Sequence, residues 1–264
     1  MQSFYIDFKN ARIHCLRFGQ GERLLIALHG FGDRARLFAI LEKALAERYT
    51  VVAFDLPFHG QTEWPERSFS KADLMGIVHT ILRRENKERL CLMGYSFGAR
   101  LCQALMPDLL PQLDKLYLLA PDGIQTKGMS TAVRTPMWVR QFLFRILKKP
   151  AWFLQLLNLG RRLGVVPPLI VHFLSFNITR PERFLRTFGC WFALDSFYLP
   201  RHRINAIWRE SGLRVDIYFG TKDEMIRYKT VKKMVEGIRT VRIYLMDAGH
   251  RLIGEDLRDR MMGG

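Results

Sequence analysis

Gly94-Tyr95-Ser96-Phe97-Gly98 is the stretch from which the fold of this 264-residue chain can be worked out. It follows an apolar run at 90–93 and precedes a helix-like run at 99–105. A serine between two glycines, at a switch from strand period to helix period, has the form of a nucleophile elbow. Glycine removes side chains that would collide with the neighbouring strand or helix in so tight a turn. Because the motif also suits an ordinary strand-to-helix turn, the remaining sequence must decide.

The composition indicates a globular chain with a sizeable core. Hydrophobic residues make up 48% of the sequence, which is ample for such a core. The length suits two small domains or one large α/β domain with an insertion. No signal peptide and no transmembrane run is visible. The four cysteines show no C-x-x-C pairing, and Cys91 and Cys102, which lie in apolar runs, are interpreted as small core residues in a reducing compartment. We therefore expect a cytoplasmic protein.

Strand-like and helix-like runs alternate along most of the chain. Two runs at 4–8 and 12–18 predict an antiparallel hairpin. Further strands are expected at 24–28, 50–54, 89–93, 115–120, 214–219 and 241–245, and helices at 35–48, 71–84, 99–105, 229–236 and after His250. This alternation predicts an α/β fold with a mostly parallel central sheet flanked by helices. Reactive residues in such sheets gather on loops at the carboxyl ends of the strands.

Four such loops carry residue types that acyl transfer needs. His29-Gly30-Phe31-Gly32 follows the first buried strand, and Ser96 follows the strand that leads into the elbow. Asp223 and His250 follow the last two expected strands. Along the chain the order is serine, aspartate, histidine.

These motifs resemble those of the α/β-hydrolase superfamily, and the resemblance covers nearly the whole chain. The loop at 29–32 resembles the family's HGxG loop, 220–223 its acid loop, and Gly249-His250 its histidine loop. Residues 55–62 are similar to its D-x-P-G-x-G-x-S stretch, with Phe58 replacing the usual glycine and Thr62 the serine. The resemblance implies an α/β-hydrolase fold with a helical cap insertion.

The elbow, acid and histidine loops imply a Ser96, Asp223, His250 triad. Ser96 would attack a carbonyl carbon after His250 removes its proton, because a free hydroxyl is a poor nucleophile. Asp223 would accept a hydrogen bond from the other imidazole nitrogen and stabilise the imidazolium. The backbone amides of Phe31 and Phe97 are the expected oxyanion donors.

Other residues compete for these roles. Asp122, after the strand at 115–120, is the main alternative to Asp223 as the acid. Asp247 is close to His250 in sequence and is expected to shape a turn. His29 and His59 precede glycines and are interpreted as structural. The histidines show no ligand spacing and there is no nucleotide-binding glycine pattern, so we expect no metal and no cofactor.

Residues 123–203 differ in character from the flanking segments 1–122 and 204–264, which we assign to the core domain. Residues 124–203 contain thirteen Lys or Arg residues but only two Asp or Glu residues in total. This segment therefore carries a net charge of +11, out of +16 for the whole chain. Their many large aromatic residues argue against a disordered linker. We interpret 123–203 as a helical cap, or lid, domain.

A helix at 136–149 illustrates this insertion. Its basic face would carry Gln141, Arg145, Lys148 and Lys149, and its apolar face Val139, Phe142, Leu143 and Ile146. For any single arginine, the simpler explanation is an apolar face packed on the core and a solvated charge. The excess charge as a whole could steer an anionic partner to the site.

The sequence thus predicts a serine hydrolase that cleaves a carboxylic ester through an acyl-enzyme, with an apolar acyl pocket under a basic, aromatic lid. Three anionic partners fit the lid: an anionic lipid surface, an acidic acyl-carrier protein, or a carboxylate-bearing small molecule. An acyl-carrier protein docked at a basic lid is similar to the arrangement in the pimeloyl-carrier-protein methyl esterase branch of the superfamily. Thioester hydrolysis, carbon–carbon bond hydrolysis and a non-catalytic binding protein remain alternatives. No nucleic-acid-binding motif is present, and the oligomeric state cannot be read from the sequence.

Overall fold

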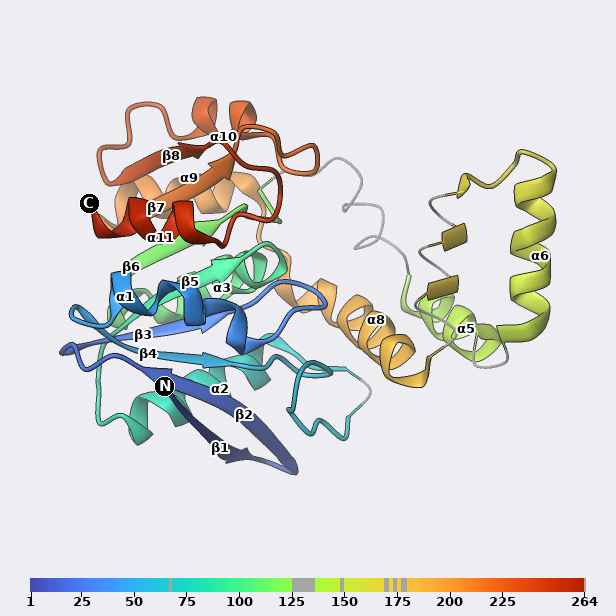
Figure 1. Ribbon diagram of the computed structural model, residues 1–264, viewed down its shortest axis with the longest axis horizontal. Helices are drawn as coiled ribbons and strands as arrows, with labels where there is room; N and C mark the ends of the chain where they lie inside the picture. Colours follow the sequence, from blue (N-terminus) through green and yellow to red (C-terminus); the bar gives the residue numbers. More distant parts are fainter. Residues whose placement is uncertain are drawn as a thin grey trace. The chain divides into compact units, whose positions relative to one another are not determined.

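The strands of the structure, a computed structural model, form one eight-stranded sheet. They are β1 (Gln2–Phe8), β2 (Ala11–Phe18), β3 (Arg23–Leu28), β4 (Tyr49–Phe54), β5 (Leu90–Tyr95), β6 (Leu113–Leu119), β7 (Arg214–Gly220) and β8 (Val241–Met246). Their order across the sheet is β1-β2-β4-β3-β5-β6-β7-β8 (Figure 1). β2 runs antiparallel to β1 and β4, and all other neighbours are parallel. The mostly parallel α/β fold predicted from the sequence is confirmed.

The structure describes residues 1–66, 68–124, 136–147, 150–168, 171–172, 175–176 and 180–263. The chain divides into two compact units. The first comprises Met1–Pro65, Ser70–Lys127 and Ser196–Gly264, and the second comprises Glu66–Phe69 and Gly128–Asp195. Within the described residues, no helix is both long and apolar enough to span a membrane.

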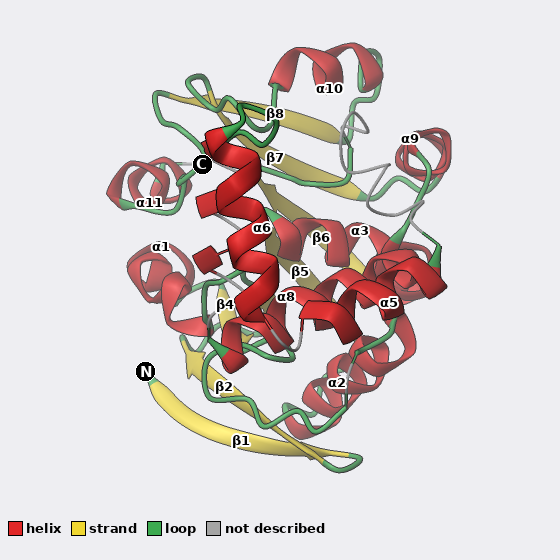
Figure 2. Ribbon diagram, turned by 90° about the vertical axis from the view of Figure 1, so that its right-hand side faces the viewer, coloured by secondary structure: helices red, strands yellow, loops and turns green. Residues whose placement is uncertain are grey.

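Helices cover both faces of the sheet in the first unit (Figure 2). They are α1 (Glu42–Leu45), α2 (Lys71–Arg84), α3 (Phe97–Leu109), α9 (Arg201–Glu210), α10 (Tyr228–Met234) and α11 (Glu255–Met262), with short 3₁₀ helices η1 (Ala35–Leu41) and η2 (Leu110–Gln112). α1 and α11 lie on one face, and α2, α3 and α9 on the other (Figure 2). Strands β3 and β4, in the middle of the sheet, are almost entirely buried, as expected for strands covered on both faces.

The segment predicted as one helix at 35–48 is a 3₁₀ helix followed by a single α-helical turn. Its buried side chains, Ala35, Phe38 and Leu41, are spaced by three residues. A 3₁₀ helix has three residues per turn and places all three on one face, whereas an α-helix would spread them. The packing of these side chains therefore overrides the α-helical preference of the segment.

The second unit contains α5 (Met137–Leu147), α6 (Pro150–Arg162) and α8 (Pro181–Ala193), followed by η3 (Leu194–Phe197). Arg140 of α5 has no exposed surface, and its guanidinium donates to Asp195 Oδ1 at 2.8 Å and to the Trp191 carbonyl at 3.0 Å. Arg140 is one of the thirteen basic residues at 124–203. The structure gives it a paired, buried position that joins α5 to the end of α8.

The orientation of α5 corrects one prediction. Phe142 was assigned to a packed apolar face, but it is 58% exposed. Residues two positions apart in an α-helix are separated by about 200° around its axis, so burial of Arg140 places Phe142 on the opposite side. Gln141 and Arg145 are exposed, as expected. Lys148 and Lys149 lie outside the described residues.

Candidate active site

The turn at Ser96 has the strained geometry of a strand-to-helix elbow. Ser96 has φ +49°, a conformation that costs a residue with a side chain about 1–3 kcal/mol. A Cβ on Gly94 would lie 2.5 Å from Ala99 Cα, and one on Gly98 would lie 2.0 Å from the Leu28 carbonyl oxygen. Both glycines are therefore required sterically, because α3 begins so close to β3 and β5.

Ser96, His250 and Asp223 form one hydrogen-bonded series. The Ser96 Oγ lies 2.9 Å from His250 Nε2, and His250 Nδ1 lies 2.8 Å from Asp223 Oδ2. The Asp223 side chain is fully buried, whereas that of His250 is 22% exposed. The other carboxylate oxygen of Asp223 accepts the amides of Met225 and Ile226, at 2.8 and 2.9 Å. The carboxylate is therefore fixed with one oxygen directed at the imidazole.

The loops that carry Asp223 and His250 are joined through their backbones. The Thr221 amide donates to the Met246 carbonyl at 2.9 Å, and the Lys222 amide to the Ala248 carbonyl at 3.0 Å. A Cβ on Gly220 would lie 2.3 Å from the Ala248 carbonyl oxygen. The glycine at the start of the acid loop thus allows the two loops to approach each other.

Tyr95 adds a contact that sequence analysis did not identify. Its hydroxyl donates to the His250 carbonyl at 3.0 Å. Burial, followed by the nearby charge of Asp33, raises the pKa of Tyr95 to about 12. The phenol therefore remains a donor at neutral pH. Residue 95 is a variable position of the G-x-S-x-G motif, so the motif contains no signal for this role.

The competing aspartates have other partners. Asp122 accepts two hydrogen bonds from the Arg100 guanidinium, at 2.9 and 3.0 Å, in a buried pair. The Asp122 carbonyl also accepts from Gln103. Asp247 is paired with Lys222 at the surface, with its side chain 80% exposed. Of the aspartates considered from the sequence, the structure brings Asp223 into contact with His250.

The two expected oxyanion amides lie at the ends of neighbouring strands. Phe97 is the first residue of α3, where a backbone N–H has no acceptor within the helix. Phe31 lies in the loop after β3 and is 39% exposed. His29 holds this loop, because its Nε2 accepts the Leu56 amide at 3.0 Å and its Nδ1 donates to the Gly30 carbonyl at 2.8 Å.

The loop after β4 tolerates both departures from the usual family pattern. Phe58 adopts φ +67°, the left-handed conformation for which glycine is the usual residue. Thr62 Oγ1 donates to the Asp55 carbonyl at 2.6 Å, a bond that serine could also make. His59 Nδ1 contacts the Pro57 carbonyl at 2.9 Å. His29 and His59 thus have the backbone-holding contacts expected of structural histidines.

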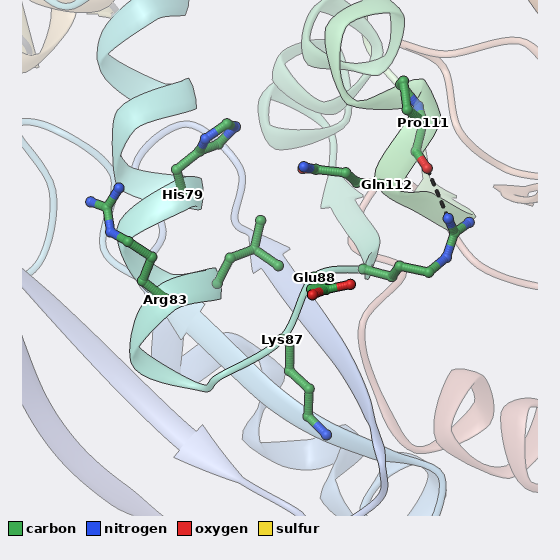
Figure 3. A pocket seen from close by; sticks show the side chains of 8 residues that line it. His79, Arg83, Lys87, Glu88, Pro111 and Gln112 are labelled. Carbon is green, nitrogen blue, oxygen red and sulfur yellow. Dashed lines mark hydrogen bonds between the residues drawn. The ribbon is translucent and has the colours of Figure 1, made fainter.

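A surface pocket of about 440 Å³ lies elsewhere on the first unit, between α2, the residues just before β5 and η2 (Figure 3). Arg83, Lys87 and Arg89 contribute positive charge to its lining, together with Glu88. Arg89 is already engaged by Asp114 and by the Pro111 carbonyl, at 2.6 and 2.8 Å. None of Ser96, Asp223 and His250 lines this pocket, so its size does not mark it as the reactive site.

Comparison with known proteins gives the family. A sequence model of the alpha/beta hydrolase family matches residues 25–261. The chain belongs to this family.

Individual relatives are distant. An uncharacterised protein of Mycobacterium tuberculosis is 29% identical over 44% of this chain and 33% of its own length. A 2-(acetamidomethylene)succinate hydrolase of Mesorhizobium japonicum is 27% identical over 36% of this chain and 34% of its own length. The chain thus matches about a third of the length of these curated relatives.

Solved structures agree with the fold over the whole chain. The thioesterase domain of the curacin biosynthetic pathway has a TM-score of 0.68 and 16% identity, and covers 100% of this chain and 98% of its own. A structure reported among the carboxylesterases of Nitrososphaera gargensis has a TM-score of 0.67 and 15% identity, over 98% of this chain and 96% of its own. At such identities the likeness concerns the fold.

Proposed function

We propose that this protein is a serine hydrolase that cleaves a carboxylic ester through an acyl-enzyme intermediate on Ser96. The observation that carries the proposal is the hydrogen-bonded series from Ser96 through His250 to Asp223, at 2.9 and 2.8 Å. Membership of the alpha/beta hydrolase family supports hydrolysis. The strained backbone of Ser96 is a further support, since such strain persists mainly at functional sites.

The hydrogen bonds define a division of roles. An ionised Asp223 can only accept, so His250 Nδ1 carries the proton and Nε2 is free to accept from the Ser96 hydroxyl. Ser96 Oγ then attacks the ester carbonyl carbon while its proton passes to His250 Nε2. The imidazolium gives this proton to the departing alkoxide, and water repeats the sequence to release the acid. Asp223 stabilises the imidazolium throughout.

The amides of Phe97 and Phe31 are the proposed oxyanion donors. Phe97 follows the nucleophile at the N-terminus of α3, where the helix dipole also favours negative charge. One such donor contributes about 3–4 kcal/mol to transition-state stabilisation.

We propose that the second unit is the cap. It has its own aromatic cluster on α8. The ring centroids of Phe184 and Phe188 are 4.6 Å apart, and those of Phe188 and Trp191 are 5.6 Å apart. An insertion of this composition could line an apolar acyl pocket and present its basic residues to an anionic partner. The acyl-carrier protein and the anionic lipid surface remain the candidate macromolecular partners, and a small carboxylate-bearing ester the candidate substrate.

The names of similar proteins do not distinguish ester cleavage from the alternative reactions. They include a thioesterase domain, carboxylesterases, an N-formylmaleamic acid deformylase and a fluoroacetate dehalogenase. Thioester or carbon–carbon hydrolysis on the same three residues, and a non-catalytic binding role, are therefore the competing hypotheses. Covalent labelling of the Ser96 hydroxyl separates the catalytic hypotheses from the binding role.

The test is fluorophosphonate labelling with the modified residue identified by mass spectrometry. We expect the wild-type protein to be labelled at Ser96, and His250→Gln to lose that label. A folded wild-type protein with no label at Ser96 would refute the proposal. A panel of p-nitrophenyl esters of increasing chain length, with matched thioesters, then ranks the substrate classes. Labelling without turnover of either series would exclude a general esterase or thioesterase.

Charge steering by the cap has its own test. Arg145, which is exposed on α5, is reversed to glutamate together with Lys148 and Lys149. We expect hydrolysis of esters on an acidic carrier protein or on anionic micelles to weaken, while small neutral esters are spared. Equal loss on both kinds of substrate would contradict steering.

A further inference from the structure

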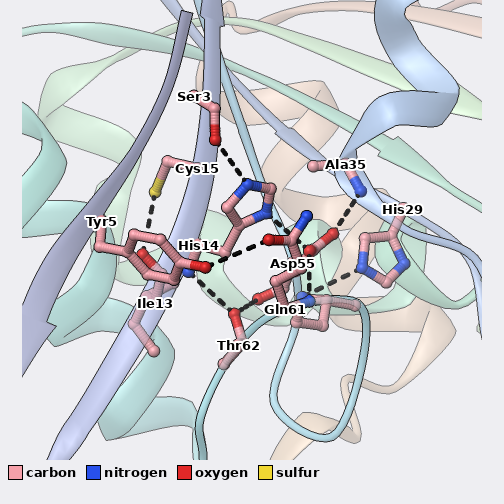
Figure 4. A network of polar contacts seen from close by, with 11 residues as sticks. Ser3, Tyr5, Ile13, His14, Cys15, His29, Ala35, Asp55, Gln61 and Thr62 are labelled. Carbon is pink, nitrogen blue, oxygen red and sulfur yellow. Dashed lines mark hydrogen bonds and ion pairs between the residues drawn. The ribbon is translucent and has the colours of Figure 1, made fainter.

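A second series of serine, histidine and aspartate lies at the β1–β2 end of the sheet. Ser3 Oγ on β1 is 2.9 Å from His14 Nε2 on β2, and His14 Nδ1 is 2.8 Å from Asp55 Oδ2, just after β4 (Figure 4). These distances match those between Ser96, His250 and Asp223. Sequence analysis did not connect the three residues, because they come from separate segments and form no local motif.

The Asp55 carboxylate is held firmly in place. Oδ1 accepts the Ala35 amide at 2.6 Å, and Oδ2 accepts the Gln61 amide at 2.8 Å in addition to His14 (Figure 4). A Cβ on Gly60 would lie 1.9 Å from Oδ2, so the glycine allows the loop to close around the carboxylate. The donors offset the loss of hydration at this buried position.

These contacts fix the roles of the imidazole nitrogens. An ionised Asp55 only accepts, so His14 Nδ1 donates to it and Nε2 accepts the proton of the Ser3 hydroxyl. Asp55 and His14 are buried, with 2% and 4% exposure, whereas Ser3 is exposed. The series therefore runs from a buried charge to a hydroxyl that solvent can reach, which is the arrangement that activates a serine.

A pocket of about 270 Å³ adjoins this series. Ser3, His14 and Asp55 line it, together with Arg34 and Arg36. Both arginines are exposed, and within the described part of the chain neither forms an ion pair. A guanidinium binds carboxylate groups well because its planar donors match their geometry.

We propose that Ser3 is a second activated nucleophile, and that its pocket takes activated esters bearing a carboxylate. Ser3 Oγ forms a bond to the ester carbonyl carbon as its proton moves to His14 Nε2. The bond from that carbon to the leaving-group oxygen breaks, and the departing oxygen takes the proton from His14. Arg34 and Arg36 hold the substrate carboxylate, and the product is an acyl ester on Ser3.

The experiment uses the Ser96→Ala protein, so that acylation at Ser3 is read without the first site. Its fold is checked by thermal unfolding. The probes are the mono-p-nitrophenyl ester of succinic acid and p-nitrophenyl butyrate, an anionic and a neutral ester of similar length. Mass spectrometry follows the acylation of each serine over time. Ser211 is the internal reference, because its hydroxyl accepts the Leu213 amide.

We expect the succinate ester to acylate Ser3 at least about 100-fold faster than Ser211, the lower range for general-base catalysis. p-Nitrophenyl butyrate should react more slowly at Ser3, and the combined Arg34→Ala and Arg36→Ala changes should abolish the preference for the succinate ester. Ser3→Ala should remove the adduct. Acylation of Ser3 no faster than Ser211 overturns the activation of Ser3, and equal rates for both esters overturn the carboxylate pocket. Neither result depends on whether Ser96 is labelled in the wild-type protein.

Discussion

The hydroxyl of Tyr95 donates to the backbone carbonyl of His250 at 3.0 Å, so the residue before the proposed nucleophile holds the residue proposed to activate it. The two rings also lie close, with centroids 5.8 Å apart. Through this bond the elbow and the histidine loop, which are 155 positions apart in the sequence, are directly connected. Tyr95 is therefore a positioning residue for His250.

Tyr95→Phe should lower kcat by up to about tenfold and leave KM nearly unchanged. The lost hydrogen bond contributes about 0.5–1.5 kcal/mol, which is close to a factor of ten in rate if all of it positions His250. Ester hydrolysis by the purified variant measures the effect. Tyr5→Phe is the matched control, since it removes an exposed phenol that donates to Gln61. An unchanged kcat with a lower melting temperature would assign Tyr95 a purely structural role.

Asp223→Asn should reduce kcat by about 10⁴-fold, because an amide in place of the carboxylate favours the wrong imidazole tautomer. The two backbone amides that hold Asp223 should still find an oxygen, so the fold should persist. Steady-state kinetics with circular dichroism checks both statements.

Asp122→Asn provides the contrast. It breaks the buried pair with Arg100, and the uncompensated guanidinium should cost about 3–5 kcal/mol of unfolding free energy. The kcat of the molecules that remain folded should change far less than in Asp223→Asn. A comparable fall in kcat for both variants would mean that the acid has been misassigned.

Gly220→Ala should destabilise the protein and reduce activity together. Its Cβ would meet the Ala248 carbonyl oxygen at 2.3 Å, so the acid and histidine loops would have to separate. Overpacking of this kind costs about 1–3 kcal/mol. At Gly249 an added Cβ meets nothing within 4 Å, which makes Gly249→Ala the matched comparison. Urea unfolding should show a clearly larger loss for Gly220→Ala, and equal losses would contradict the close approach.

Stability should fall as the pH rises above about 9. Burial raises the pKa of Tyr49, Tyr117 and Tyr218 above the ordinary tyrosine value of 10.0, and the pKa of Cys15 and Cys102 above the ordinary cysteine value of 9.0. Between the unfolded and folded pKa values the native state binds more protons than the unfolded state, so the unfolding free energy decreases with pH.

Urea unfolding at intervals from pH 8 to 11 measures this slope, on the order of 1.4 kcal/mol per pH unit for each proton taken up on folding. Tyr218→Phe should make the slope shallower. Tyr198, whose side chain is exposed, supplies the control variant Tyr198→Phe, which should leave it unchanged. A stability that is flat above pH 9 would show that these groups ionise without unfolding.

Local patterns explain why much of the fold could be predicted. The glycines of the elbow and of the acid loop mark close backbone approaches, and their spacing is visible in the sequence. The strands that lead to these loops are short apolar runs with clear ends. For this reason Ser96, Asp223 and His250 could be named as candidates before the structure showed that they lie within hydrogen-bonding distance.

Features that depend on the direction of side chains could not be predicted. The sequence predicts a solvated charge for Arg140, yet its side chain is buried and paired with Asp195. The 3₁₀ helix at Ala35–Leu41 follows from packing on a spacing of three, which resembles an α-helical pattern over so short a run. The Ser3, His14 and Asp55 series needs the pairing of β1, β2 and β4, which no local motif reveals. The division between core and cap remains a prediction.

The acid and histidine loops are joined to each other by backbone hydrogen bonds at Thr221 and Lys222, independently of Ser96. The pairing of Asp223 with His250 should therefore survive removal of the nucleophile. A Ser96→Ala protein would keep the binding surface and the imidazole in place while lacking the atom that forms the covalent bond. Such a variant is a natural bait: incubated with cell metabolites, it should retain the uncleaved substrate for mass spectrometric identification.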